Sequence, residues 1–324
     1  MTSQVRIGTS GYSFADWVGT VYPRGMKPGA FLSHYAKLFD SVEINATYYR
    51  TPSPQTFARM VERTPEDFTF VVKVPRAMTH DLVAFDRELE PFKKAIEPLV
   101  RAGRLGGLLA QFPYAFVPSE AARRHLGKLA QSLGSEIPVH VEFRHDDWYA
   151  TATYDLLAKL GLGFVNVDLP ELSHLPRPSE VATNRTGYVR LHGRNETTWW
   201  NQDKAKAKAL AGNRYDYLYS ASELEPWAAR IECLAAGADI TYVFANNCHL
   251  GQSVVNALQL GQRLGHSPVE DATSLFTRSL DEKIGDMQQA IASRKEREEK
   301  PGVASELVSD VRVRHRSRFA DVAR

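Results

Sequence analysis

Short runs of β-branched and aromatic residues recur along the chain, and between most of them the apolar residues repeat at helical spacing. Capping signals mark the starts of several of these helical segments, for example Ser119 before residues 120–133 and the pair Ser220 and Glu223. The runs that indicate strands are VRIGTS (5–10), SVEINA (41–46), FTFVVKV (68–74), GGLLAQF (106–112), PVHVEFR (138–144), GFVNVDL (163–169), GYVRLHG (187–193) and ITYVFAN (240–246). Eight strands alternating with helices predict an α/β fold, a closed parallel (β/α)8 barrel of the TIM type.

The pattern departs from a regular barrel in two connections and at the C-terminal end. Residues 169–184 contain three prolines and no sustained apolar face, so the sixth helix is predicted to be short or replaced by a loop. Residues 194–219 form a long loop after the seventh strand, and long loops in compact domains are often functional. The alternation stops near residue 265, which predicts a barrel domain at 1–265 and a helical or disordered extension at 266–324.

The alternation within each strand predicts which side chains point into the barrel. In a strand, successive side chains point to opposite faces, and one face of a barrel strand is the interior. On the fifth strand, Val139 and Val141 would then face the helices, while Glu142 and Arg144 point inward. The same rule places these polar side chains inside: Ser10, Glu43, Asn45, Lys73, Gln111, His140, Asn166, Asp168, Arg190 and His192. For the last strand the rule does not decide between Asn246 and Asn247, and Asn247 is taken as the candidate.

This inward set indicates a functional site at the carboxyl ends of the strands. Barrel interiors are ordinarily filled with branched aliphatic side chains, and each buried ion costs several kcal/mol unless it is paired. A buried lattice of ion pairs that only fixes the packing is the alternative for any one of these residues. The polar residues nearest the carboxyl ends, such as Lys73, Arg144 and His192, lie where barrel enzymes carry their chemistry.

Composition and charge limit the classes of protein to which the chain could belong. A chain of 324 residues with 43% hydrophobic and 24% charged residues is ordinary for a globular protein, and its formal charge of +2 gives no general case for nucleic acid or membrane binding. Cys233 and Cys248 lack the spacing of a metal site or a disulfide framework. The sequence shows neither a signal peptide pattern nor an apolar stretch of membrane-spanning length, so a cytoplasmic protein without a membrane partner is predicted.

The charges of the predicted site favour an anionic ligand. Three inward carboxylates would face Lys73, Arg144 and Arg190, with a histidine and a further arginine beside them. A surplus of positive charge in a walled pocket favours phosphate or carboxylate, which suit arginine geometry. The predicted substrate-binding residues are Lys73, Arg144, Arg190, Asn45, Gln111, Asn247, Tyr12 and Trp199. The two aromatic residues belong to a larger group in the loops that would stack on a sugar or a base, or simply pack the loops.

Catalytic and metal-binding roles remain open alternatives for the acidic residues. Glu43 or Glu142 beside His192 would exchange protons, with Asp168 as a further candidate, because burial and neighbouring charges shift pKa values. Glu142, Asp168 and His192 also make a plausible ligand set for a divalent metal. The nearby Arg144 and Lys73 argue against that metal, because they would already neutralise the carboxylates. No cofactor is therefore predicted to be required, and a divalent metal stays the alternative.

Several motifs resemble one known family. These are IGTSGYSFADWVGTVYP, SVEINATYYRTPSPQTFARM, FTFVVKVPRAMTH, LLAQFP, VEFRHDDWY, YVRLHGR, RYDYLYS and YVFANN with a following NALQL. In this order they are similar to the YecE-like family, domain of unknown function 72, over roughly residues 5 to 262. The resemblance implies a TIM-type barrel and no reaction. Its motifs fall on Glu43, Asn45, Lys73, Gln111, Glu142, Arg144, Arg190, His192 and Asn247. In this chain Cys248 follows Asn247 where the family tends to place histidine, so no role is carried over to His249.

Three hypotheses about function follow. The first is a barrel enzyme that performs acid-base chemistry on a phosphorylated or otherwise anionic sugar-like substrate, with hydrolase, isomerase and lyase left undistinguished. The second is a nucleic-acid-binding protein or a phosphodiesterase of the abasic-site endonuclease type, suggested by analogy between barrels of this kind. The third is a sensor that binds a metabolite without turnover. The sequence predicts no oligomeric state.

Overall fold

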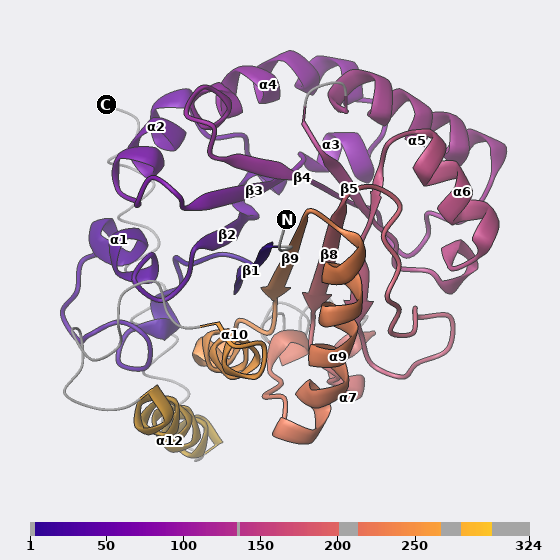
Figure 1. Ribbon diagram of the computed structural model, residues 1–324. Coiled ribbons are helices and arrows are strands. Elements are labelled where there is room, and N and C mark those ends of the chain that lie inside the picture. Colours follow the sequence, from indigo (N-terminus) through magenta and orange to yellow (C-terminus); the bar gives the residue numbers. More distant parts are fainter. Residues whose placement is uncertain (1–3, 135–136, 201–212, 267–279, 300–324) are drawn as a thin grey trace.

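The computed structural model describes residues 4–134, 137–200, 213–266 and 280–299. Parallel strands lie at the centre, with helices around them (Figure 1). The strands are β1 (Gln4–Thr9), β2 (Ser41–Ile44), β3 (Thr69–Lys73), β4 (Leu105–Gln111), β5 (Val139–Glu142), β6 (Gly163–Phe164), β7 (Asn166–Asp168), β8 (Thr186–Leu191) and β9 (Ile240–Ala245). The α-helices are α1 (Phe31–Tyr35), α2 (Pro54–Glu62), α3 (Arg76–Thr79), α4 (Phe85–Arg101), α5 (Glu120–Leu133), α6 (Thr151–Lys159), α7 (Glu196–Trp199), α9 (Ala221–Gly237), α10 (Gln252–Arg263) and α12 (Leu280–Glu299).

The strands are hydrogen-bonded as two parallel sheets, in the orders β1-β9-β8-β7 and β2-β3-β4-β5-β6. A parallel bridge between Ser10 and Glu43 links the first strands of the two sheets. At the other junction β6 and β7 are two parts of one predicted strand, separated by Val165, whose N–H still donates to the Val141 carbonyl at 3.0 Å. The predicted alternation of parallel strands and helices in a TIM-barrel-like fold is thus confirmed, and complete closure of the barrel stays a prediction.

Two buried apolar clusters occupy the two faces of the strands. Val189 and Leu191 of β8 belong to the larger cluster, which lies between the strands and the helices, whereas Tyr188 belongs to the smaller cluster in the interior. The interior cluster also contains Tyr242 and Phe244 of β9. These aromatic and aliphatic side chains fill one end of the interior, and the polar side chains of the site lie above them, at the carboxyl ends of the strands.

The connection from β7 to β8, residues 169–185, contains no helix. Asn166 holds this connection, because its Oδ1 accepts from the Val181 N–H at 2.8 Å and its Nδ2 donates to the Val181 carbonyl at 2.9 Å. The predicted inward direction of Asn166 is therefore wrong. A loop that covers a strand needs partners for its backbone polar groups, so the polar side chain faces the loop, while Val165 and Val167 fill the interior.

The predicted C-terminal extension contains a helix in its described part. Ile284, Met287 and Ile291 of α12 are buried in the larger apolar cluster. Its polar side also makes contacts, since Arg294 donates to the Asp16 carbonyl at 2.6 Å and Lys295 lies 2.5 Å from Asp216. Residues 300–324 lie outside the described residues, and the division at residue 265 stays a prediction. No helix in the described ranges is both long and apolar enough to cross a membrane.

Candidate functional site

A pocket of about 520 Å³ opens at the carboxyl ends of the strands, a size typical of sites for small ligands. Residues within two positions of the strands' carboxyl ends form its floor, because parallel strands bring these ends to one side of the fold. The floor consists of Ser10, Asn45, Lys73, Gln111, Arg144, Arg190 and Asn246. The walls come from loop residues, which are Phe14, Tyr48, Tyr49, His80, Pro113, Tyr114, Leu175, Trp199, Trp200, Arg214, Tyr215 and Cys248.

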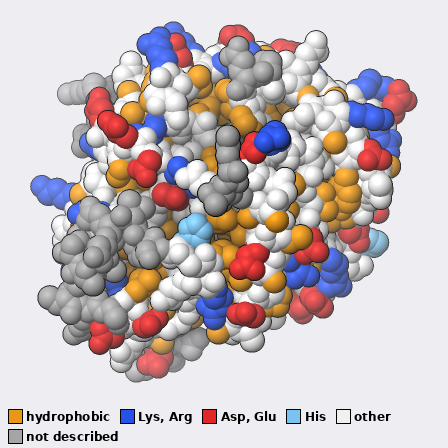
Figure 2. All heavy atoms as spheres, viewed as in Figure 1, with side chains coloured by type: hydrophobic (Ala, Val, Ile, Leu, Met, Phe, Trp, Pro, Cys, Tyr) orange, Lys and Arg blue, Asp and Glu red, His pale blue; other side chains and the backbone are white. Residues whose placement is uncertain are grey.

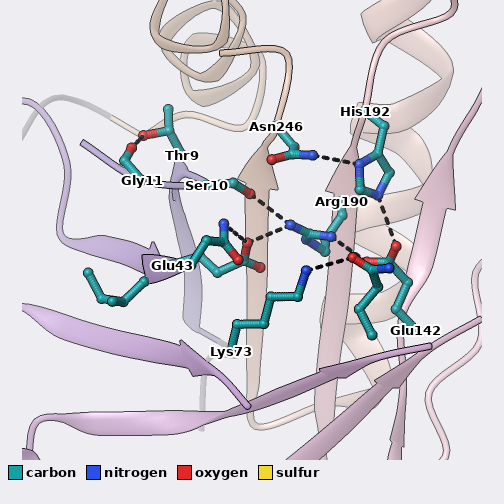
Figure 3. Close-up of polar contacts among 12 residues, drawn as sticks. Thr9, Ser10, Gly11, Glu43, Lys73, Glu142, Arg190, His192 and Asn246 are labelled. Carbon is teal, nitrogen blue, oxygen red and sulfur yellow. Dashed lines mark hydrogen bonds and ion pairs between the residues drawn. The ribbon is translucent and has the colours of Figure 1, made fainter. Parts of the chain in front are cut away.

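Arg190 is the centre of a buried network beneath this floor. Figure 3 shows its guanidinium reaching from β8 between Glu43 and Glu142. Its nitrogens lie 2.6 Å from Glu43 Oε1 and 2.5 Å from Glu142 Oε2, and one of them donates to Ser10 Oγ at 3.2 Å. Burial would lower the pKa of Arg190, but Glu142 and Glu43 outweigh burial and raise it. The arginine therefore stays charged and cancels part of the charge of both carboxylates.

Glu142 is fully buried and joins Arg190 to the neighbouring Arg144. Arg144 Nε lies 2.5 Å from Glu142 Oε1, and this is an ion pair without hydrogen-bond geometry. Burial alone would raise the pKa of Glu142, but Arg144 and Arg190 hold it well below its usual range. Glu142 is thus a fixed anion that positions two arginines. A carboxylate held in this way is a poor proton acceptor near neutral pH.

His192 lies beside this pair and is neutral at ordinary pH. Its Nε2 lies 3.3 Å from Glu142 Oε1, and its Nδ1 lies 2.8 Å from Asn246 Nδ2. Burial, reinforced by Arg144, lowers its pKa to about 3. With no proton on Nδ1, the ring accepts from the Asn246 amide and presents its remaining N–H toward the carboxylate. The arrangement fixes the tautomer and orients Asn246 at the floor of the pocket.

Lys73 differs from the arginines, since no carboxylate of the described residues lies within 4.0 Å of its amine. Nζ donates to Gln111 Oε1 at 2.7 Å and lies 4.3 Å from the centre of the Tyr48 ring. Burial and then Arg190 lower the pKa of Lys73 to about 7, with Glu142 and Glu43 opposing the shift. Lys73 is therefore the floor residue whose protonation changes near neutral pH.

The wall above Arg144 is aromatic and carries another cation. Trp199 is buried, and the guanidinium carbons of Arg144 and Arg214 lie 5.8 and 5.7 Å from its ring centre. The neighbouring Trp200 is 42% exposed, so it can contact a ligand at the mouth. Both guanidinium groups are thus within cation–π distance of one indole at the wall of the pocket.

Most of the predicted binding residues lie together, while the predicted acids and bases lie one layer deeper. Lys73, Arg144, Arg190, Asn45, Gln111 and Trp199 all line the pocket. Glu43, Glu142 and His192 are fully buried and are not among the lining residues. Glu43 accepts from Tyr188 at 2.7 Å and from Asn45 at 2.9 Å, so its oxygens serve the network around Arg190.

The predicted inward placement of Asp168 is wrong. Its two oxygens accept from Arg194 at 2.9 and 2.8 Å, and one also accepts from Trp227 of α9. Burial raises its pKa, against these hydrogen bonds. Asp168 thus binds α9 to the loop after β8 on the outer face of the strands. The predicted metal set of Glu142, Asp168 and His192 is not brought together.

Two further predicted binding residues face away from the pocket. Asn247 donates to the Tyr217 carbonyl at 2.7 Å and to Asn256 of α10 at 2.8 Å, so Asn246 takes the inward position instead. The Tyr12 ring packs against Tyr35 in the outer layer, with 6.2 Å between ring centres, and Phe14 reaches the pocket in its place. The Asn247 error arises just beyond a strand end, where strict alternation no longer holds, and the Tyr12 error arises in a loop, where the sequence does not fix the direction of a side chain.

Sequence reasoning missed pocket residues that belong to loops. His80, Tyr114, Leu175 and Arg214 line the pocket without lying on a strand. Alternation says nothing about such positions. A usable signal existed for Arg214 alone, because it belongs to the aromatic segment RYDYLY in the long connection after the seventh predicted strand.

Comparison with known proteins identifies relatives across most of the chain. Residues 6–277 match the family model described as "Protein of unknown function DUF72". UPF0759 protein YunF of Bacillus subtilis is 27% identical over 268 residues, which are 79% of this chain and 93% of YunF. UPF0759 protein YecE of Escherichia coli K12 is 32% identical over 144 residues, 44% of this chain and 52% of YecE. The crystal structure of a DUF72 family protein (TM1631) from Thermotoga maritima is 40% identical with a TM-score of 0.73, covering 81% of this chain and all of the other.

Proposed function

The chain belongs to the DUF72 family of proteins of unknown function, and from its pocket we propose that it binds an anionic, sugar-like small molecule and transfers a proton on it through Lys73. One observation carries the proposal. Lys73 lies in the pocket with Gln111 as its hydrogen-bond acceptor, beside arginines whose charges the buried glutamates already offset. An amine placed there meets the substrate and changes protonation near neutral pH.

Electrostatics support an anionic substrate. Glu43 and Glu142 together offset Arg190 and Arg144, so a protonated Lys73 and the exposed Arg214 leave the pocket with positive charge. Arg144 and Arg214 also have guanidinium N–H groups suited to phosphate or carboxylate oxygens. The proposed chemistry does not call for a metal in this pocket, because Lys73 and Arg214 supply the positive charge that an anionic substrate needs.

The polar and aromatic residues around Lys73 support a sugar-like substrate. Asn45, Gln111 and Asn246 line the floor and offer amide groups suited to hydroxyls. Asn45 Oδ1 is buried and has no hydrogen-bond donor among the described residues, so a substrate hydroxyl would satisfy it. Tyr48, Trp199 and Trp200 present ring surfaces on which the apolar face of a sugar packs well.

The role of each site residue follows from whether it lines the pocket and from its protonation state. We assign substrate binding to Arg144, Arg190, Asn45, Gln111, Asn246 and Trp199, and proton transfer to Lys73. Glu43, Glu142 and His192 become positioning residues. This revises the sequence-based hypothesis that Glu142 and His192 exchange protons, because Glu142 is held as an anion and His192 as a neutral ring.

A nucleic-acid ligand has less support. Figure 2 shows Lys and Arg side chains interspersed with Asp and Glu over the coloured part of the face that it draws, whereas a nucleic-acid site usually presents a continuous basic surface. Affinity for DNA or RNA that falls steeply with salt would favour that hypothesis over the small-molecule one.

Thermal unfolding with added ligands tests the proposal. A ligand that binds the native state raises the unfolding midpoint, so inorganic phosphate and a panel of sugar phosphates should raise it, and neutral sugars should do so less. Arg144→Met should weaken phosphate binding by roughly tenfold or more, the loss of one charge-assisted hydrogen bond. The exposed Arg123 on α5 provides the matched control, Arg123→Met, which should change nothing.

Turnover then separates an enzyme from a sensor. Any sugar phosphate that binds should be assayed for isomerisation, elimination and hydrolysis across pH 5 to 9. We expect a rate that changes near pH 7 in the wild type and is lost in Lys73→Met, with ligand binding weakened but still measurable. Binding without turnover of any bound compound would favour the sensor, and no binding of anions at all would contradict the proposal.

A further inference from the structure

Two histidines and an aspartate meet at the rim, away from the buried network. His145 and Asp146 lie in the loop after β5, where η4 (Asp146–Trp148) begins, and His174 lies in the connection from β7 to β8. One ligand atom from each residue lies within 4.8 Å of the other two. The Asp146 N–H donates to the His174 carbonyl at 3.1 Å, and the two imidazole rings stack with centres 5.4 Å apart. The fold therefore brings two loops together with their ligand atoms converging.

The hydrogen bonds leave these atoms short of a positive partner. The Asp147 N–H donates to His145 Nδ1 at 3.2 Å, so this nitrogen carries no proton. Asp146 Oδ1 lies 3.3 Å from that same nitrogen and 3.7 Å from His174 Nδ1. This oxygen is buried and has no hydrogen-bond donor among the described residues. This carboxylate oxygen thus lies beside two imidazole nitrogens and lacks a positive partner, which a cation placed among the three atoms would supply.

The backbone conformation at His174 places its imidazole ring against His145. Its φ is 60°, in the left-handed region that residues other than glycine rarely adopt. A strained backbone conformation persists only where the surrounding structure holds it, and such conformations are common at ligand sites. Here the left-handed turn directs the His174 ring onto His145 and precedes Leu175, which is buried in the pocket wall.

We propose that His145, Asp146 and His174 bind a divalent transition-metal ion of the zinc class. Two imidazole nitrogens and one carboxylate oxygen suit such ions, whereas magnesium and calcium prefer oxygen ligands throughout. Asp147, whose Oδ2 lies 3.5 Å from His145 Nδ1, adds negative charge beside the site. Three protein ligands leave at least one coordination position for water or another ligand.

The ion would fasten one wall of the pocket. The Tyr114 ring packs on His145 with 4.8 Å between centres, and both Tyr114 and Leu175 line the pocket. A metal joining the two loops would hold these walls at a fixed separation without entering the floor around Lys73. The metal site therefore does not rest on the proposed proton transfer, and either can fail without the other.

Metal binding to the untagged full-length protein, stripped with a chelator, tests the site. Titration with Co²⁺ should show one equivalent bound, with visible absorption of an ion in nitrogen and oxygen ligands, and Zn²⁺ should displace it. The informative variants are His174→Asn, which tolerates the left-handed backbone, and Asp146→Asn, which keeps the side-chain shape. Each should weaken Co²⁺ binding by about tenfold or more, since even the loss of a residue that only supports a ligand has such an effect.

A carboxylate in the same connection supplies the control. Glu171 is 75% exposed in its side chain and pairs with Arg177 at 3.2 Å, so Glu171→Gln should leave Co²⁺ affinity unchanged. Circular dichroism of the variants shows whether each is folded. The proposal is overturned by a wild-type protein that binds no equivalent of Co²⁺, or by folded His174→Asn and Asp146→Asn variants with wild-type affinity.

Discussion

The buried amine of Lys73 should make the stability of the protein rise with pH. Its side chain is only 8% exposed, and its pKa falls from the ordinary value of 10.5 to about 7 on folding, because of burial and then Arg190. Each unit of difference between the folded and unfolded pKa values corresponds to about 1.4 kcal/mol, so protonated Lys73 destabilises the folded state by roughly 5 kcal/mol at most. The penalty is fully present below pH 7, where both states are protonated, and disappears as the pH rises toward 10.5, because the unfolded state then loses its proton as well.

Lys73→Met removes this penalty while keeping the length and flexibility of the side chain. The variant loses the hydrogen bond to Gln111, a contribution of about 1 kcal/mol, and Gln111 can turn to water in the pocket. We therefore expect Lys73→Met to be more stable than the wild type by about 2–4 kcal/mol at pH 6, with the difference shrinking steadily up to pH 10.

Urea unfolding at several pH values measures the difference. Lys159→Met, at an exposed lysine in the last turn of α6, is the matched control and should show no such trend. If Lys73→Met is no more stable than the wild type at pH 6, or if the difference does not change between pH 6 and pH 10, the amine is not held near its neutral form and the proton-transfer role loses its basis.

Two further predictions concern the buried ion pairs. Arg190→Met should destabilise the protein by about 3–5 kcal/mol in urea unfolding, because Glu43 and Glu142 lose a shared buried partner, and a loss below 1 kcal/mol would show that the pairs are not buried as described. Asp168→Asn should lower the thermal midpoint through its lost pair with Arg194, yet leave phosphate affinity as in the wild type, since Asp168 faces α9. A tenfold weaker affinity in a folded Asp168→Asn variant would place this carboxylate in the pocket after all.

Strand alternation predicted the floor of the site well where the strands are regular. Lys73, Arg144 and Arg190 lie where the two-residue period puts them, because a buried strand cannot rotate one side chain without moving its neighbours to the wrong face. The rule failed on the sixth predicted strand. There Asn166 is satisfied on the outer face by the loop of residues 169–185, Asp168 is satisfied there by Arg194 and by Trp227 of α9, and the valines turn inward.

Other features were beyond the reach of a sequence pattern. The choice between Asn246 and Asn247 depends on where β9 ends, and the amide of Asn247 is taken by the Tyr217 carbonyl, a partner thirty residues away in sequence. Whether a buried acid is reactive also depends on its neighbours. The position of Glu142 on its strand predicts a proton acceptor, whereas nitrogens of Arg144 and Arg190 lie 2.5 Å from its oxygens and hold it as an anion.

The contact of α12 with Asp216 has a consequence for how relatives of this protein should be compared. Lys295 lies beyond residue 277, where the family match ends, yet it binds Asp216 in the short segment that brings Arg214 and Tyr215 to the pocket. A fragment trimmed to the family boundary would keep every floor residue and lose this support from outside. Relatives with identical pocket residues but different C-terminal segments would accordingly shape the mouth differently, so ligand preferences should be measured on whole chains and not transferred between trimmed ones.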